Sequence, residues 1–166
     1  MKLLSLALLA LVTPVLAESN PKAIAERFIG SWRLVSIEGG LPASDPNDPP
    51  TGIIMYDSTG HMAVQISRGS KRPGFVPSQA TTEQKAAAFS AYTAYYGTFW
   101  VDPAAGTVTH HFEGSITPGM IGHDNVRYYE FKGNRLILSP VENGKGGRLA
   151  REATKRHLTW ERIPPK

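Results

Sequence analysis

Two neighbouring segments of this sequence place a histidine, an arginine and a tyrosine where they could bind a small molecule. Side chains alternate between the two faces of a β-strand, so the sequence shows which residues of each segment share a face. These faces carry Val108, His110 and Phe112 in the first segment, and Arg127, Tyr129 and Phe131 in the second. If both point inward, an imidazole, a cation and a phenol lie within apolar walls, where they could bind an acidic or carbonyl group. The alternative is that Arg127 lies near an open end and is solvated.

A second group of candidate binding residues is aromatic. Tyr92, Tyr95 and Tyr96 follow a predicted helix, and Trp100 lies four residues further on. Such side chains can form an apolar wall with hydrogen-bonding tips, although they could also simply belong to the core. We therefore include all four as candidate ligand-binding residues.

Metal and cofactor chemistry is not expected. His110 and His111 are adjacent in a strand and so point to opposite faces, which prevents them from binding one ion together. The other histidines show no ligand spacing, and there is no cysteine. Nothing matches Gly-x-Ser-x-Gly, a phosphate-binding loop or a dinucleotide fingerprint. The sequence therefore predicts no metal site and no cofactor.

The elements that position these residues are short strands separated by turns, which is typical of an all-β fold. Turn residues such as those at 57–60, 102–106 and 132–134 predict short hairpins between sequential strands. Eight such strands can close into an antiparallel up-and-down barrel. We expect them at 31–38, 52–57, 61–68, 95–102, 107–117, 125–132, 134–140 and 156–163.

One helix is predicted between the third and fourth strands, from Thr82 to about Tyr92. Thr81 with Gln84 resembles a capping box, and Ala86 to Ala88 favour a helix. We expect this helix to lie across one mouth of the barrel or against its wall.

The N-terminus indicates export. Residues 1–17 combine Lys2, an apolar run and a small-residue cleavage site at Ala17, which is typical of a signal peptide. The run is broken by Pro14 and is shorter than the roughly 20 residues of a membrane span. We therefore expect a secreted or periplasmic protein without a stable membrane anchor, with a lead-in segment at 18–28 and a barrel domain at 29–164.

A net charge of +4 gives no reason to expect nucleic-acid binding.

The first and last strands of the predicted barrel carry a recognisable sequence signature. Gly30 and Trp32 open the first strand, and Trp160 and Arg162 close the last. Similar segments follow at 52–56, 60–66, 91–99 and 106–111. This pattern resembles the calycin barrels, and in particular the bacterial and fungal lipocalin-like domain family. The resemblance implies an eight-stranded barrel with an internal cavity, and a structural role for Gly30, Trp32 and Arg162, with the cation lying across the indole at the closed end.

The sequence and this resemblance together favour an exported barrel that binds a small apolar or aromatic, possibly acidic, molecule. An isomerase or cyclase that uses His110 or a tyrosine in the same cavity is a second possibility. A solidly packed barrel whose loops bind a partner is a third. The sequence gives no indication of the oligomeric state.

Overall fold

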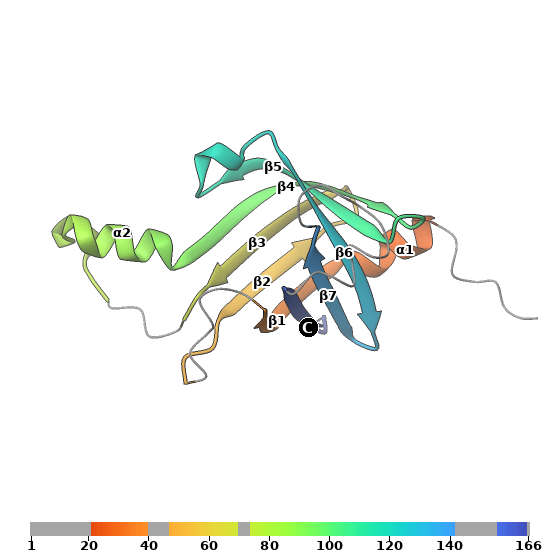
Figure 1. The fold of residues 1–166 in the computed structure, drawn as a ribbon, viewed down its shortest axis with the longest axis horizontal. Helices are drawn as coiled ribbons and strands as arrows, with labels where there is room; N and C mark the ends of the chain where they lie inside the picture. The colour runs from red at the N-terminus through yellow and green to blue at the C-terminus, as the bar shows by residue number, and fades with distance from the viewer. Residues whose placement is uncertain (1–20, 40–46, 70–73, 142–155, 166) are drawn as a thin grey trace, which may run out of the picture.

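The fold, taken from a computed structural model, is a closed barrel of antiparallel strands (Figure 1). The structure describes residues 21–39, 47–69, 74–141 and 156–165, so the predicted signal peptide lies outside the described residues. Within them, each strand pairs with the next in sequence and the eighth pairs with the first. The strands are β1 (Gly30–Glu38), β2 (Thr51–Tyr56), β3 (His61–Ser67), β4 (Tyr92–Asp102), β5 (Thr107–Ser115), β6 (Asp124–Lys132), β7 (Arg135–Pro140) and β8 (His157–Arg162). The predicted eight-stranded up-and-down barrel is confirmed.

The described residues include two α-helices, at opposite ends of the barrel (Figure 1). Helix α1 (Pro21–Phe28) leads into β1, and helix α2 (Thr82–Ser90) lies between β3 and β4. Two short 3-10 helices, η1 (Pro77–Gln79) and η2 (Pro118–Met120), lie in connections. None of the described helices has the length and apolar character needed to span a membrane. We call the two ends of the barrel the α1 end and the α2 end.

Phe28, the last residue of α1, fills the α1 end. Its side chain is fully buried. Its ring packs edge-on against Tyr56, Tyr129 and Phe131, with centroids 5.0–5.4 Å apart. Such edge-to-face contacts add to the free energy gained by burying the rings. The lead-in helix thus closes this end with an aromatic plug.

Arg162 completes this end from the last strand. Its guanidinium carbon lies 4.0 Å from the centroid of the Trp32 ring, a cation–π contact. Arg162 Nη1 donates a hydrogen bond to the carbonyl of Ile29 (2.8 Å), and Nη2 donates to the carbonyl of Arg27. A Cβ on Gly30 would lie 2.9 Å from Nη1, and the φ of Gly30 is +126°, so glycine is required there.

Helix α2 differs from the prediction in where it lies. Its capping box forms as expected, because Gln84 N donates to Thr81 Oγ1 (3.2 Å) and Thr81 N donates to Gln84 Oε1 (2.9 Å). However, the helix has no buried residue, and Phe89 is 50% exposed. The helix extends away from the strands (Figure 1) instead of covering a mouth or packing on the wall. Local capping thus forms this helix without a core-facing side that would dock it.

Alternation along the strands produces one apolar core inside the barrel. Every second residue of β1, β2 and β3 is buried over much of its length, whereas β5 is buried on both faces from Thr107 to His110 and the buried residue of β6 is Tyr128. The buried core residues include Trp32, Leu34, Ile54, Val64, Ile66, Val108, Phe112, Leu136, Leu138, Leu158 and Trp160. Polar side chains that enter this core are therefore few and informative.

Candidate functional site

His110 is the polar centre of the barrel interior. It lies on the inward face of β5 with an exposed fraction of 0%. Hydrogen bonds join its Nε2 to Tyr56 Oη (2.8 Å) and its Nδ1 to Tyr95 Oη (3.2 Å). Side chains from β2, β5 and β4 thus form a continuous Tyr56–His110–Tyr95 chain inside the core.

The environment keeps His110 and Tyr56 uncharged at neutral pH. Burial, with a smaller effect of the Arg127 charge, lowers the pKa of His110 well below its usual range. Burial also raises the pKa of Tyr56 well above its usual range; Tyr95 adds to this rise and Arg127 opposes it. His110 is therefore a neutral imidazole, and Tyr56 is a protonated phenol.

A neutral imidazole has one N–H donor and one lone pair. One tyrosine must therefore donate to His110 while the other accepts from it. The accepting tyrosine keeps its own O–H proton, for which no other described residue provides an acceptor. One phenol O–H in the interior is consequently available to a bound molecule.

Arg127 adds a second unused donor. It lies opposite Val108 of β5 in the register, and the inward row of β6 continues with Tyr129 and Phe131. Both of these contact Phe28. Arg127 Nε is buried and has no hydrogen-bond partner, and no described carboxylate forms an ion pair with this arginine. The guanidinium thus faces the interior without a counter-charge.

Trp160 in β8 is a third buried donor, because its Nε1 also has no partner in the described structure. Of the buried polar residues described, only His110 lies on an inward row, because Thr107, Thr109 and Ser139 lie on the opposite faces of β5 and β7, and none of the four is an acid. Among the described residues, the buried side-chain atoms without a partner, Arg127 Nε and Trp160 Nε1, are both hydrogen-bond donors. Such an arrangement is suited to hold a carbonyl or carboxylate oxygen.

The structure brings together only part of the predicted aromatic group. Tyr95 faces the interior, whereas Tyr96 and Trp100 are 58% and 47% exposed. The Tyr92 hydroxyl donates to Gln65 Oε1 on an exposed surface (2.8 Å). Tyr96 covers Gly114, where a Cβ would lie 2.2 Å from its ring. Tyr92, Tyr96 and Trp100 thus lie on the outer face of β4 and do not line the interior.

Tyr56 is a site residue that sequence reasoning missed. Ile54 and Tyr56 alternate with exposed positions in β2, so the period of two already assigns Tyr56 to the inward face. The signal was therefore present, but its partner His110 lies 54 residues away in sequence.

The adjacent His111 belongs to the outer surface, as the alternation predicts. Its Nδ1 lies 2.8 Å from Asp124 Oδ1. Among the described residues, no group of three or more acidic or imidazole side chains is placed to hold a metal ion.

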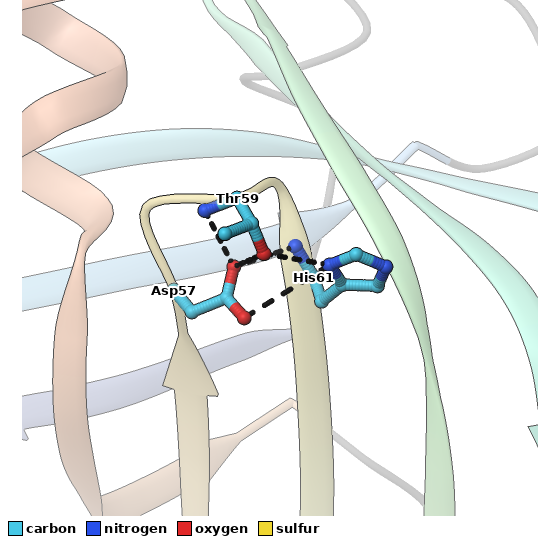
Figure 2. A network of polar contacts seen from close by, with 3 residues as sticks. All are labelled: Asp57, Thr59 and His61. Atoms are coloured by element: carbon cyan, nitrogen blue, oxygen red, sulfur yellow. Dashed lines mark hydrogen bonds and ion pairs between the residues drawn. The ribbon is translucent and has the colours of Figure 1, made fainter.

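A second polar network occupies the exposed turn between β2 and β3 (Figure 2). Thr59 Oγ1 and the backbone N–H groups of Thr59 and His61 donate to Asp57 Oδ1, over 2.7–2.9 Å. Because the Thr59 proton is directed to Asp57, the contact of Thr59 Oγ1 with His61 Nδ1 (2.8 Å) requires the imidazole to donate. His61 therefore does not activate Thr59 as a nucleophile, and these bonds lower the pKa of Asp57 and hold the turn.

Comparisons with known proteins show to which family the chain belongs. A comparison with curated protein sequences finds no match. Among solved structures, the wild-type fluorescent protein UnaG matches with a TM-score of 0.38 and 13% identity, over 84% of this chain and 99% of that chain. A single-site variant of UnaG matches with a TM-score of 0.37 and 13% identity, over 83% of this chain and 97% of that one. The lipocalin-like domain matches residues 29–163, so the chain belongs to the lipocalin-like domain family.

Proposed function

We propose that the barrel interior binds a small, largely apolar or aromatic molecule that carries a carbonyl or acidic oxygen. The observation that carries this proposal is the unpaired Arg127 Nε, which is buried beside the Tyr56–His110–Tyr95 chain. A buried donor without a partner costs about 1–3 kcal/mol. A bound oxygen acceptor removes that cost, and the surrounding apolar side chains bind the rest of the molecule.

The same residues could serve acid–base catalysis, as an isomerase or cyclase would require. Both ring nitrogens of His110 contact phenols, so a proton exchanged with a bound molecule would pass through Tyr56 or Tyr95. The raised pKa of Tyr56 favours retention of its proton. This suits hydrogen-bond donation better than proton transfer near neutral pH, and binding is the function that the geometry supports best.

The binding proposal is tested with anilinonaphthalene sulfonate, an anionic aromatic probe that fluoresces in apolar surroundings. Arg127→Leu should weaken binding of this probe roughly tenfold or more, because hydrogen bonds to charged groups contribute about 1.5–3 kcal/mol. The control is Arg135→Leu, which removes an exposed arginine at the first residue of β7. Circular dichroism and thermal melting check that both variants fold.

Equal probe affinity in the wild-type protein and Arg127→Leu would contradict the proposed site. Native mass spectrometry of protein purified from its own host provides an independent test, since a retained small molecule would identify the ligand directly. A barrel that binds no probe and retains no molecule would favour the third possibility, a packed interaction module.

We also propose that the protein is exported and that residues 1–17 are removed. The proposal rests on Lys2, the apolar run and the small residues Val15 and Ala17. N-terminal sequencing of extracytoplasmic material should begin at Glu18. An intact Met1 in that material would contradict export by this route.

A further inference from the structure

Three arginines share the inward rows of the barrel toward the α2 end. Arg127 lies on the inward row of β6, opposite Val108 and Pro140. Arg68 directly follows β3, and its backbone N–H still pairs with the carbonyl of Ala91 (2.9 Å). Arg156 directly precedes β8. Strands separated around the barrel thus each contribute one guanidinium.

By strand alternation all three fall on inward rows, with Arg127 partly buried and Arg68 and Arg156 exposed just beyond the ends of β3 and β8. Arg68 continues the buried row of Met62, Val64 and Ile66 in β3. Arg156 continues the buried row of Leu158 and Trp160 in β8. In the pairing of β7 with β8, Leu138 lies opposite Leu158, and this register continued by two residues sets Arg156 opposite Pro140. Pro140 is also the partner of Arg127, so Arg127 and Arg156 flank one position of β7.

The electrostatics are consistent with this convergence. Burial lowers the pKa of Arg156, and the charges of Arg127 and Arg68 lower it further. The Arg127 charge also acts on His110 and Tyr56. Arg127 is therefore close enough to interact both with Arg156 and with the Tyr56–His110–Tyr95 chain.

No described acid forms an ion pair with Arg68, Arg127 or Arg156. Asp48 is the nearby acid, with its carboxylate against Gly69, and it is engaged in an interaction of its own. Glu38 and Asp124 fall on outward rows, where Glu38 accepts from Ser36 Oγ and Asp124 contacts His111. Three like charges that converge without a partner are unfavourable unless an anion joins them.

We infer that the ligand carries an anionic head group that lies at the α2 end between Arg68, Arg127 and Arg156, with its apolar body directed toward the α1 end. The inference rests on the proposed binding function and adds the charge and orientation of the ligand. The orientation follows from the fold, because Phe28 and its aromatic neighbours fill the α1 end. Two arginines there are stacked on aromatic rings, Arg27 on Phe131 and Arg162 on Trp32. Planar guanidinium groups suit carboxylate, sulfonate or phosphate oxygens, to which they can donate in pairs.

The test uses two probes that differ only in charge. Anilinonaphthalene sulfonate carries a sulfonate, and phenylnaphthylamine is the same aromatic body without it. Both are titrated into the wild-type protein, Arg68→Gln, Arg156→Gln and the double variant. Arg135→Gln serves as the control, because it removes one exposed arginine from the α1 end. Melting curves check the fold of each variant.

We expect the wild-type protein to bind the sulfonate more tightly than the neutral probe, with an affinity that falls as salt is added. Arg68→Gln and Arg156→Gln should each weaken sulfonate binding roughly threefold to tenfold, which corresponds to about 0.6–1.4 kcal/mol. Neutral-probe binding should stay unchanged, as should both affinities in Arg135→Gln.

Other outcomes separate the two proposals. If both probes bind equally well and Arg68→Gln and Arg156→Gln change neither affinity, the anionic head group is excluded while the binding function stands. If neither probe binds the wild-type protein, the binding function itself is contradicted, and the arginine site with it.

Discussion

Arginines at the two ends of this barrel have opposite surroundings. At the α1 end, Arg162 stacks on Trp32 and donates to the carbonyls of Ile29 and Arg27. Toward the α2 end, Arg127 has a buried Nε without a partner, and no described acid pairs with Arg156. One cation is satisfied within the fold, while the others converge without an acceptor.

We interpret this difference as that between a structural arginine and the arginines of the proposed binding site. A cation whose donors all find carbonyls contributes to stability. A cation left without an acceptor costs stability and is tolerated where a ligand supplies the acceptor. Substitutions at the two ends should therefore change stability in opposite directions.

The largest effect is expected at the α1 end. Trp32→Ala removes a fully buried indole whose Nε1 donates to the carbonyl of Phe28 (2.8 Å). The free energy of unfolding should fall by about 3–5 kcal/mol, as for other large aromatic residues removed from a core. Urea denaturation measures this change.

A double-mutant cycle with Arg162→Ala sharpens the test. The two substitutions should be non-additive by about 0.5 kcal/mol or more, because the guanidinium lies 4.0 Å from the indole centroid. Strict additivity would show that the stacking contributes nothing to stability.

A change in pH should have an intermediate effect on the free energy of unfolding, because His110 titrates differently in the folded and unfolded protein. The pKa of His110 is lowered in the folded protein, so as pH falls below about 6.5 the unfolded chain binds a proton that the folded chain does not. The free energy of unfolding should therefore decrease as pH falls from 7 to 5, by at most about 1.4 kcal/mol per pH unit from this group. Tyr56, Tyr95 and Arg127 are the groups that face His110.

The measurement compares pH dependence between variants instead of absolute stability. His110→Gln should show a shallower decrease between pH 7 and pH 5 than the wild-type protein. His61→Gln, at an exposed histidine of the β2–β3 turn, is the matched control. An unchanged slope in His110→Gln would mean that His110 titrates alike in the folded and unfolded states.

The sequence predicted most of the barrel because its information is local. Alternating side chains mark the strands, and glycines such as Gly60, Gly106 and Gly133 take the positive φ that the turns require. The same alternation predicted that Arg127, Tyr129 and Phe131 share a face. The expected stacking of a cation on Trp32 came from the family resemblance, which covers both chain ends.

What the sequence did not predict depends on boundaries and distant partners. The placement of Tyr92 depends on a boundary, because β4 begins at Tyr92, whereas the predicted strand began at Tyr95. Within the predicted strand, alternation already sets Tyr95 opposite Tyr96 and Trp100. The proximity of Arg68 and Arg156 joins residues far apart in the sequence and outside the expected pocket faces. Neither the strand boundary nor this distant contact follows from the local pattern.

The smallest effect, but the one with the most informative sign, is expected at the α2 end. Arg156→Gln removes a charge that is repelled by Arg127 and Arg68. In the ligand-free protein the variant should be as stable as the wild type or more stable, by less than about 1 kcal/mol, the range of partly exposed charge interactions. Arg162→Gln should instead lower the free energy of unfolding, because it removes donors from the carbonyls of Ile29 and Arg27.

Thermal melting of both variants at low and high salt measures this contrast. Added salt screens the repulsion among the three arginines, so the stability that Arg156→Gln gains over the wild type should become smaller. The stability that Arg162→Gln loses should change little, because the hydrogen bonds it removes are short-range. Adding anilinonaphthalene sulfonate should reverse the order of the wild type and Arg156→Gln, since the bound anion stabilises the protein with all three arginines more. If Arg156→Gln destabilises the ligand-free protein as Arg162→Gln does, Arg156 is a structural residue and the distinction between the two ends fails.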